Sequence, residues 1–263
     1  MIKTFREDIP LYEFEILQNE NQQFHFVTTR NGGISSKNYE SLNLSFKVGD
    51  LLENVIENRQ RLIEVCNLSR AKVYFPDQCH TSRVGLVVEN MVDTDLLETD
   101  ALITNKKNLC IAILAADCVP ILFFDPKAQA IGVAHSGWKG TVGRIAARTI
   151  ELMVKKFGTD PVNLRAGIGP SISQQNYEVG EEVAGQFRTW FSDTPEVFIE
   201  NKVTGKVHID LWEANRQLLL RCGVQPEHIE ISGLCTYDNQ DDFFSARRDG
   251  MQCGRFATGI MLK

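Results

Sequence analysis

The sequence predicts an α/β fold of the α+β type, built as a mixed-sheet sandwich in a single domain over residues 1–263. Segments typical of strands occur both in pairs and alternating with segments typical of helices, which favours a mixed sheet over a regular doubly wound one. No repeat, low-complexity tract or Pro/Ser-rich linker divides the chain. Hydrophobic residues make up 43% of it, which is ample for one sizeable core.

The first half of the chain predicts one helix among several strands. Alternating or short apolar runs indicate strands over residues 24–30, 71–80, 101–105 and 109–125. The run 51–68 instead has apolar residues at helical spacing, and Asp50 in front of it suits the N-cap position. Pro120 and the Asp125–Pro126 pair are expected to interrupt the long apolar stretch that contains them.

Strands and helices alternate in the second half. A short strand over 130–135 leads through a glycine-bearing turn into a helix of roughly four turns, which Gly158 ends. The remaining elements are expected at 164–170 (a strand), 177–191 and 208–224 (helices) and 228–255 (two strand-like pieces). Asp210 is the predicted N-cap of the last helix, and Gly223 is predicted just beyond its C-terminus.

Composition and charge narrow the class of protein. A net charge of −6 argues against a sequence-independent nucleic-acid binder, which needs a basic surface. The N-terminus does not resemble a signal peptide, and no apolar run approaches the ~20 residues of a membrane span. Seven cysteines, an odd number without CxxC spacing, favour a reduced compartment. We expect a cytoplasmic protein that acts on a small molecule, without nucleic-acid or membrane partners.

His80, Cys118 and His135 are the candidate metal ligands. Three borderline-soft donors without an obvious fourth are what a catalytic zinc site requires, since structural sites are normally closed by four protein ligands. Each histidine follows a predicted strand, and Cys118 lies where a strand breaks, so all three are expected to project into one cleft. The alternative is a buried cysteine and two hydrogen-bonding histidines, because the separations match no zinc-finger pattern.

Two glycine-rich stretches are candidate anion sites. HSGWKGTVGR places Gly137 and Gly140 at a helix start, whose free N–H groups and dipole favour an anion, and Lys139 adds charge. TTRNGGISS places Arg30 after a strand, beside glycines that permit close backbone approach to a ligand. Tight turns with solvated basic residues are the alternative for both. Solvated arginine is also the ordinary expectation for the glycine-flanked Arg247, Arg248 and Arg255.

Seven motifs together resemble the YfiH-like family, which has been called laccase-domain or multicopper polyphenol oxidase and, later, purine nucleoside phosphorylase. They are TTRNGGIS, QCHTSRV, DALIT, ADCVPILFFD, AHSGWKGT, GIGPSIS…YEVG and FFSARRDG…GR. The similarity runs from about residue 24 to about residue 257. It implies a single-domain, YfiH-like αββα sandwich, related in architecture to cysteine hydrolases.

The resemblance also implies chemistry. It implies one zinc held by His80, Cys118 and His135, phosphorolysis of adenosine, inosine and 5′-methylthioadenosine to base and ribose 1-phosphate, and deamination of adenosine. Under this hypothesis Cys118 and His135 are catalytic, and the neighbouring Asp117 donates a proton or orients a ligand histidine. The candidate substrate- or phosphate-binding residues are Arg30, Arg59, Ser136, Gly137, Lys139 and Gly140.

Several alternatives stay open at this point. Bacterial members are also linked to a peptidoglycan-editing amidase that acts on a cytoplasmic muramyl precursor. A His₂Cys site could take up copper, although five histidines are too few for a blue-copper centre plus a trinuclear cluster, which a multicopper polyphenol oxidase needs. Without metal, Cys118 would be a thiolate nucleophile and His135 its base. A non-catalytic metabolite-binding module is the last alternative, and the protein is expected to be a monomer or homodimer.

Overall fold

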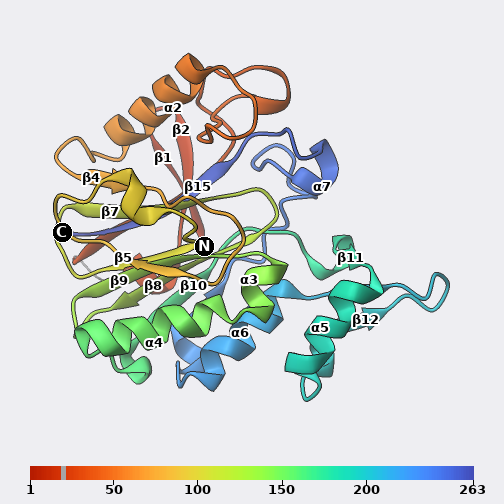
Figure 1. Ribbon diagram of the computed structural model, residues 1–263. Helices are drawn as coiled ribbons and strands as arrows, with labels where there is room; N and C mark the ends of the chain where they lie inside the picture. The colour runs from red at the N-terminus through yellow and green to blue at the C-terminus, as the bar shows by residue number, and fades with distance from the viewer. Residues whose placement is uncertain (19–21) are drawn as a thin grey trace.

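The structure, a computed structural model, describes residues 1–18 and 22–263. In this part of the chain two six-stranded mixed sheets pack face to face between helices. Helix α2 (Leu52–Val65) covers the outer face of one sheet, while α4 (Ile145–Phe157) and α6 (Leu211–Arg221) cover the outer face of the other (Figure 1). The predicted α/β class and its αββα layering are confirmed.

The two sheets are formed by strands from all parts of the chain. The first has the order β1 (Ile2–Arg6), β2 (Ile9–Glu13), β3 (Gln23–Thr28), β15 (Phe256–Leu262), β7 (Leu109–Ala115), β4 (Lys72–Tyr74). The second has the order β14 (Ile229–Ile231), β10 (Arg165–Ile168), β8 (Val119–Asp125), β9 (Ala130–Ser136), β6 (Ala101–Thr104), β5 (Val84–Leu86). The pairs β4–β7, β5–β6 and β10–β14 are parallel and the others antiparallel, so both sheets are mixed.

The long apolar run 109–125 spans both sheets. Ile111 and Ile113 of β7 pack with Leu122 of β8 in the layer between the sheets. Phe123, whose side chain lies on the opposite face of β8, packs in the layer beneath α4 and α6. Side chains of a strand alternate between its two faces, and here both faces are buried, so the sequence is apolar at nearly every position.

The chain crosses from the first sheet to the second between β7 and β8. Asp117 makes this turn with φ +84, a left-handed conformation. Pro120 was expected to interrupt the apolar run, which is wrong, because it lies inside β8 opposite His135 of β9. The interruption therefore falls immediately before Cys118, at the edge where β7 ends and β8 begins.

Two helix predictions need correction. The N-cap of α2 is Leu51, and Asp50 instead accepts hydrogen bonds from the Leu51 N–H, Ser35 and Asn43. The helix expected after the glycine-bearing turn is two helices, α3 (Trp138–Val142) and α4, because Arg144 between them has a left-handed φ of +59. The predicted helix ends at Gly158 and beyond Arg221 are confirmed, as is the Asp210 N-cap.

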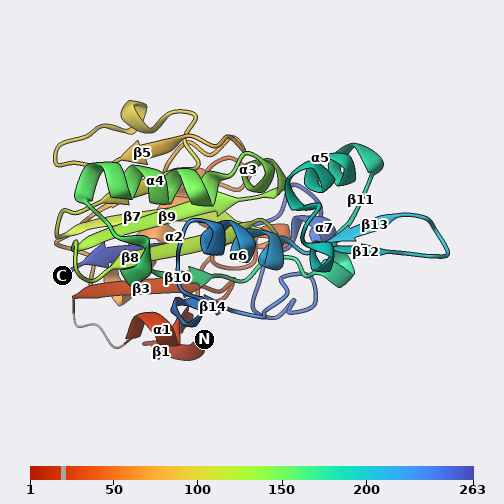
Figure 2. The same cartoon turned by 90° about the horizontal axis from the view of Figure 1, so that it is seen from below.

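A smaller unit extends from one end of the sandwich (Figure 2). It contains the three-stranded sheet β11 (Glu178–Val179), β13 (Val207–Ile209), β12 (Phe198–Glu200), with helix α5 (Glu181–Phe191) beside it. Two short helices, α1 (Glu15–Gln18) and α7 (Ala246–Asp249), complete the α-helices of the described residues. No helix in the described ranges has the length and apolar character needed to span a membrane.

Candidate metal centre

Three elements bring His80, Cys118 and His135 together at one end of the sandwich. His80 lies in the loop after β4, Cys118 in the turn between the sheets and His135 in β9. One donor atom from each residue lies within 4.8 Å of the other two. The Cys118 Sγ is 3.9 Å from the His80 Nε2, and the two imidazole centroids are 5.0 Å apart.

This donor set fits a zinc ion. Zinc–sulfur and zinc–nitrogen bond lengths in a tetrahedral site place sulfur and nitrogen roughly 3.5 Å apart, close to the Cys118–His80 separation. Two imidazoles and a thiolate suit zinc or copper, and three protein donors leave a coordination position open. Exposure also differs among the ligands: His135 is buried, Cys118 half-buried and His80 exposed, so the open side faces solvent.

A buried carboxylate, Asp100, fixes two of the three ligands. It accepts hydrogen bonds from the main-chain N–H groups of Cys79 (3.2 Å), His80 (3.0 Å) and Thr81 (2.7 Å). It also accepts one from the Nδ1 of His135 (2.8 Å), which leaves the Nε2 of that ring directed at the centre. Burial alone would raise the pKa of this carboxyl, but the His135 imidazole and the main-chain donors lower it to about 2.

The same neighbours set the ionisation of Cys118. Burial opposes the charged thiolate, but the imidazoles of His135 and His80 outweigh it and lower the pKa of this thiol. The thiolate and Asp100 in turn raise the pKa of His135 despite its burial. The thiolate form is the one that binds metals and attacks electrophiles, so Cys118 suits either a metal ligand or a nucleophile.

Gly137 directly borders the thiolate. A Cβ at this position would lie 2.7 Å from the Cys118 Sγ and 3.5 Å from the His80 Cδ2. Any side chain would therefore displace the ligands, which explains the glycine after His135-Ser136.

Two residues of the predicted anion site, Ser136 and Gly140, are buried beside the ligands. Ser136 is fully buried and hydrogen bonds to Asn215 (2.7 Å) and Thr141 (3.1 Å). Gly140 is buried in α3, where a Cβ would lie 3.1 Å from the His135 carbonyl oxygen. The Ser136 hydroxyl therefore bonds within the fold, and phosphate binding by the main chain of this turn stays a prediction.

Asp117 also differs from its expected role. Its Oδ1 accepts the Thr236 hydroxyl (2.6 Å) and its Oδ2 accepts the main-chain N–H of Arg247 (2.7 Å). The carboxylate that orients a ligand histidine is Asp100. Asp117 joins the Cys118 turn to the C-terminal loop.

The two predicted phosphate arginines lie in different surroundings. Arg30 donates to the carbonyls of Glu40 and Gln240 and stacks on Phe244, so it clamps two loops together. Arg59 stacks on two aromatic rings, with its Cζ 4.3 Å from the centroid of each, and donates from Nε to the Leu44 carbonyl. One of these rings is Phe75, which belongs to the segment leading to His80. Arg59 is thus the better placed of the two.

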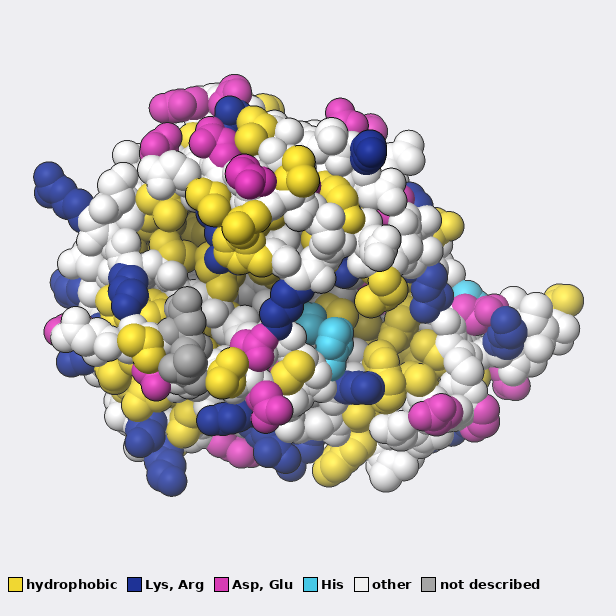
Figure 3. All heavy atoms as spheres, turned by 45° about the horizontal axis from the view of Figure 1, so that its top comes forward, with side chains coloured by type: hydrophobic (Ala, Val, Ile, Leu, Met, Phe, Trp, Pro, Cys, Tyr) yellow, Lys and Arg dark blue, Asp and Glu magenta, His cyan; other side chains and the backbone are white. Residues whose placement is uncertain are grey.

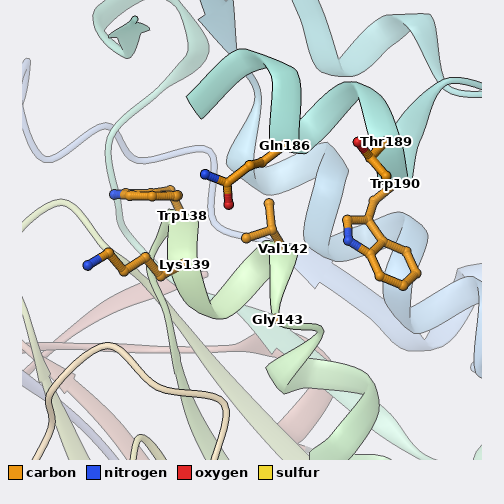
Figure 4. Close-up of a pocket in the computed structure, with 7 residues that line it drawn as sticks. All are labelled: Trp138, Lys139, Val142, Gly143, Gln186, Thr189 and Trp190. Atoms are coloured by element: carbon orange, nitrogen blue, oxygen red, sulfur yellow. The ribbon is translucent and has the colours of Figure 1, made fainter. Parts of the chain in front are cut away.

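Lys139 is exposed and lines a groove between α3 and α5. The groove, of about 540 Å³, has Trp138 and Lys139 side by side at one end and Trp190 at the other (Figure 4). The Lys139 Nζ is 5.6 Å from the centroid of the Trp138 ring. None of the three ligands lines this groove.

The surface view shows where the imidazoles lie. Histidine side chains sit in a hollow of the molecule, with hydrophobic side chains along one wall and Lys or Arg side chains at its rim (Figure 3). An apolar wall with basic groups at the edge suits a small molecule that has a planar apolar part and an anionic partner.

The chain is similar to a known protein family, to characterised relatives and to a solved structure. The family model described as "Multi-copper polyphenol oxidoreductase laccase" matches residues 24–263. A purine nucleoside phosphorylase of Bacteroides thetaiotaomicron is 41% identical, with 98% of each chain covered. Adenosine deaminase RL5, from an unknown prokaryotic organism, is 37% identical, with 90% of this chain and 93% of the relative covered. The crystal structure of the hypothetical protein YfiH of Bacillus licheniformis superimposes with a TM-score of 0.90 at 35% identity, covering 97% of this chain and 96% of that one.

Proposed function

The chain belongs to the multi-copper polyphenol oxidoreductase laccase family, and from this membership we propose that it is a zinc-dependent purine nucleoside enzyme. The proposed reactions are phosphorolysis of adenosine, inosine and 5′-methylthioadenosine, which yields the base and a ribose 1-phosphate, and deamination of adenosine to inosine. Relatives named for each of the two activities support this proposal. The resemblance to YfiH-like proteins is confirmed.

The convergence of His80, Cys118 and His135 carries the proposal. Bound to these donors, zinc would supply a Lewis acid with one open position, suited to activating water for attack on C6 of adenosine. Asp100 keeps the proton of His135 at Nδ1, and Gly137 keeps the space around the thiolate free of side chains. For phosphorolysis, Arg59 is the better placed of the two sequence-predicted arginines for one phosphate contact, because its guanidinium is held between aromatic rings, one of which leads to the His80 segment.

Product analysis tests the proposal. Zinc-loaded protein is incubated with adenosine, with and without phosphate, and the nucleosides and bases are separated by chromatography. We expect inosine without phosphate, and adenine and hypoxanthine in addition when phosphate is present. His135→Ala, purified in parallel, should form none of these. Equal product from this variant would mean that a contaminating host enzyme is responsible and would remove support for the proposal.

A metal-free hydrolase is the second candidate, and the geometry supports it specifically. Asp100, His135 and Cys118 form a chain of carboxylate, imidazole and thiolate, the arrangement of a cysteine nucleophile with its base and orienting group. Full activity in protein stripped of metal, abolished by thiol alkylation, would favour this candidate. Turnover of a muramyl dipeptide measured in the same assay would show whether an amide is the substrate.

A further inference from the structure

Three arginines near the C-terminus, two in α7 and one after it, differ in how their guanidinium groups are used. Arg248 donates to the carbonyls of Thr236, Tyr237 and Phe243 and to the Asp249 carboxylate. Arg255 donates to the carbonyls of Cys253, Gly254 and Met251. Arg248 thus donates from all three guanidinium nitrogens and Arg255 from both terminal nitrogens, so both side chains hold this part of the chain in shape.

Arg247 is fixed on one side only. Its Nη1 donates to the carbonyls of Asn176 (3.3 Å) and Glu178 (3.2 Å), and its Cζ lies 5.3 Å from the centroid of the Tyr177 ring. Within residues 1–18 and 22–263, its Nε and Nη2 have no hydrogen-bond partner. Those two nitrogens form the edge of the guanidinium that binds an oxyanion with two parallel hydrogen bonds, and the residue is exposed.

Two contacts place this arginine next to the metal centre. The main-chain N–H of Arg247 donates to Asp117, whose neighbour in the chain is Cys118. Tyr177, whose ring contacts the guanidinium, is half-buried, and both burial and the Cys118 thiolate raise its pKa. A fixed cation with an open edge therefore borders the hollow that contains the ligands.

We propose that the Nε and Nη2 edge of Arg247 binds the phosphate consumed in phosphorolysis. This inference rests on the proposed function. In the reaction a phosphate oxygen forms a bond to C1′ of the ribose as the bond from C1′ to the purine nitrogen breaks. The bonding pair remains on the purine, which takes the proton that dihydrogen phosphate loses. Arg247 holds the nucleophile in place, and the pre-fixed guanidinium loses little side-chain freedom when phosphate binds.

The two proposed reactions provide an internal control, because deamination uses no phosphate. Arg247→Gln should raise the KM for inorganic phosphate roughly 10- to 100-fold, the range of a charge-assisted hydrogen-bonded contact, and leave phosphate-free deamination within about twofold of wild type. Arg247→Lys retains the charge without the two-pronged edge and should restore only part of the loss. Arg188→Gln, on the exposed side of α5, is the matched control and should change neither reaction.

Calorimetric titration with inorganic phosphate alone gives a readout independent of turnover, and Arg247→Gln should weaken binding by the same factor. If Arg247→Gln has the phosphate affinity and the KM for phosphate of wild type, the inference is overturned and the proposed function stays intact. Equal loss of deamination and phosphorolysis in both Arg247 variants would also overturn it, since the residue would then only support the fold. If wild-type protein converts no nucleoside at all, the proposed function fails, and the phosphate-binding role of Arg247 fails with it.

Discussion

Asp100 connects two ligands that approach the candidate centre from different elements. Its hydrogen bonds to the main chain of residues 79–81 hold the loop that carries His80, and its bond to Nδ1 sets the ring of His135. A carboxylate behind a ligand histidine typically changes metal affinity 10- to 100-fold when it is removed.

Asp100→Asn is therefore expected to weaken zinc binding by roughly 10- to 100-fold while the protein stays folded. Competition with a chromophoric chelator measures this affinity. Asp125→Asn is the control, because Asp125 is equally buried but lies at the far end of β8 from Cys118. Equal zinc affinities for the two variants would show that Asp100 does not support zinc binding.

Gly137→Ala tests the space beside the thiolate. The new methyl group would lie 2.7 Å from the Cys118 Sγ, so the ligands must move apart and zinc affinity should fall at least ~10-fold. Gly180→Ala, at a helix N-cap with no atom within 4 Å of the added Cβ, should bind zinc as wild type does. Unchanged affinity in Gly137→Ala would show that the ligands do not occupy this arrangement.

The burial of His25 predicts that the free energy of unfolding depends on pH. Burial lowers the pKa of His25 from 6.5 to about 4, and the Phe14 N–H, which donates to Nε2 at 2.8 Å, requires that nitrogen to be unprotonated. As the pH falls from 6.5 to 4, only the unfolded chain takes up this proton, so the free energy of unfolding decreases. The stabilisation is complete above pH 6.5, and the expected loss is about 3 kcal/mol.

Urea denaturation of wild type and His25→Gln at pH 7 and pH 4.5 measures this effect. Carboxylates titrate in both proteins, so the difference between them isolates the histidine. We expect wild type to lose about 2 to 3 kcal/mol more than the variant over this interval. Equal losses in both proteins would assign the acid sensitivity to other groups.

The individual site residues were predictable to different degrees. His80, Cys118 and His135 are rare residue types in distinctive motifs, and the structure places their donor atoms together as expected. Asp100 was missed although it opens the DALIT motif, because its role depends on the pairing of β6 with β9, which the sequence does not display. Asp117, adjacent to Cys118 in sequence, was favoured for that proximity alone.

At the level of elements, the loop over residues 31–43 depends on one side chain of α2. Asn58, fully buried, accepts the Ile34 N–H (2.9 Å) and donates to the Ser35 hydroxyl (2.9 Å) and to the carbonyls of Ser41 (3.1 Å) and Asn43 (2.9 Å). The glycine-rich TTRNGGISS stretch, considered above as an anion site, is held in shape by this network.

Asn58→Ala should lower the free energy of unfolding by about 3 kcal/mol, because it leaves several buried polar groups without partners. Asn54→Ala, one turn earlier on the same helix, removes a single 3.4 Å contact and should cost about 0.5 kcal/mol or less. Denaturant midpoints of the two variants check the difference. A small effect at Asn58 would mean that the loop is held by other contacts.

The elements themselves were predicted well where periodicity is strong. The strands β3 and β6 to β10 and the helices α2, α5 and α6 follow from apolar spacing. The strands β1, β2 and β15 of the first sheet were not predicted, and of the two strands expected over 228–255 the structure has only β14. Two further errors are local: the sequence does not show that Arg144 takes a left-handed conformation between α3 and α4, or that Pro120 continues a strand. At Pro120 the pairing of β8 with β9 overrides the local preference.

At the scale of the molecule, the centre lies where the chain passes from one sheet to the other. β7 belongs to the first sheet, while β8 and β9 belong to the second, so the Cys118 turn and the end of β9 share one edge of the sandwich. Two packed sheets with helices on both outer faces support this edge, and the loop that carries His80 and the short helix α7 that carries Arg247 lie against it. A site of this kind positions its ligands mainly through the scaffold.

The metal content of the purified protein tests the account most directly. Mass spectrometry should find about one zinc per chain in wild type and in Cys79→Ala, whose exposed thiol is a neighbour of His80 but not one of the three donors. Cys118→Ala and His135→Ala should retain less than about a tenth of that amount. Zinc retained in full by Cys118→Ala, or lost equally from Cys79→Ala, would contradict a centre built from His80, Cys118 and His135.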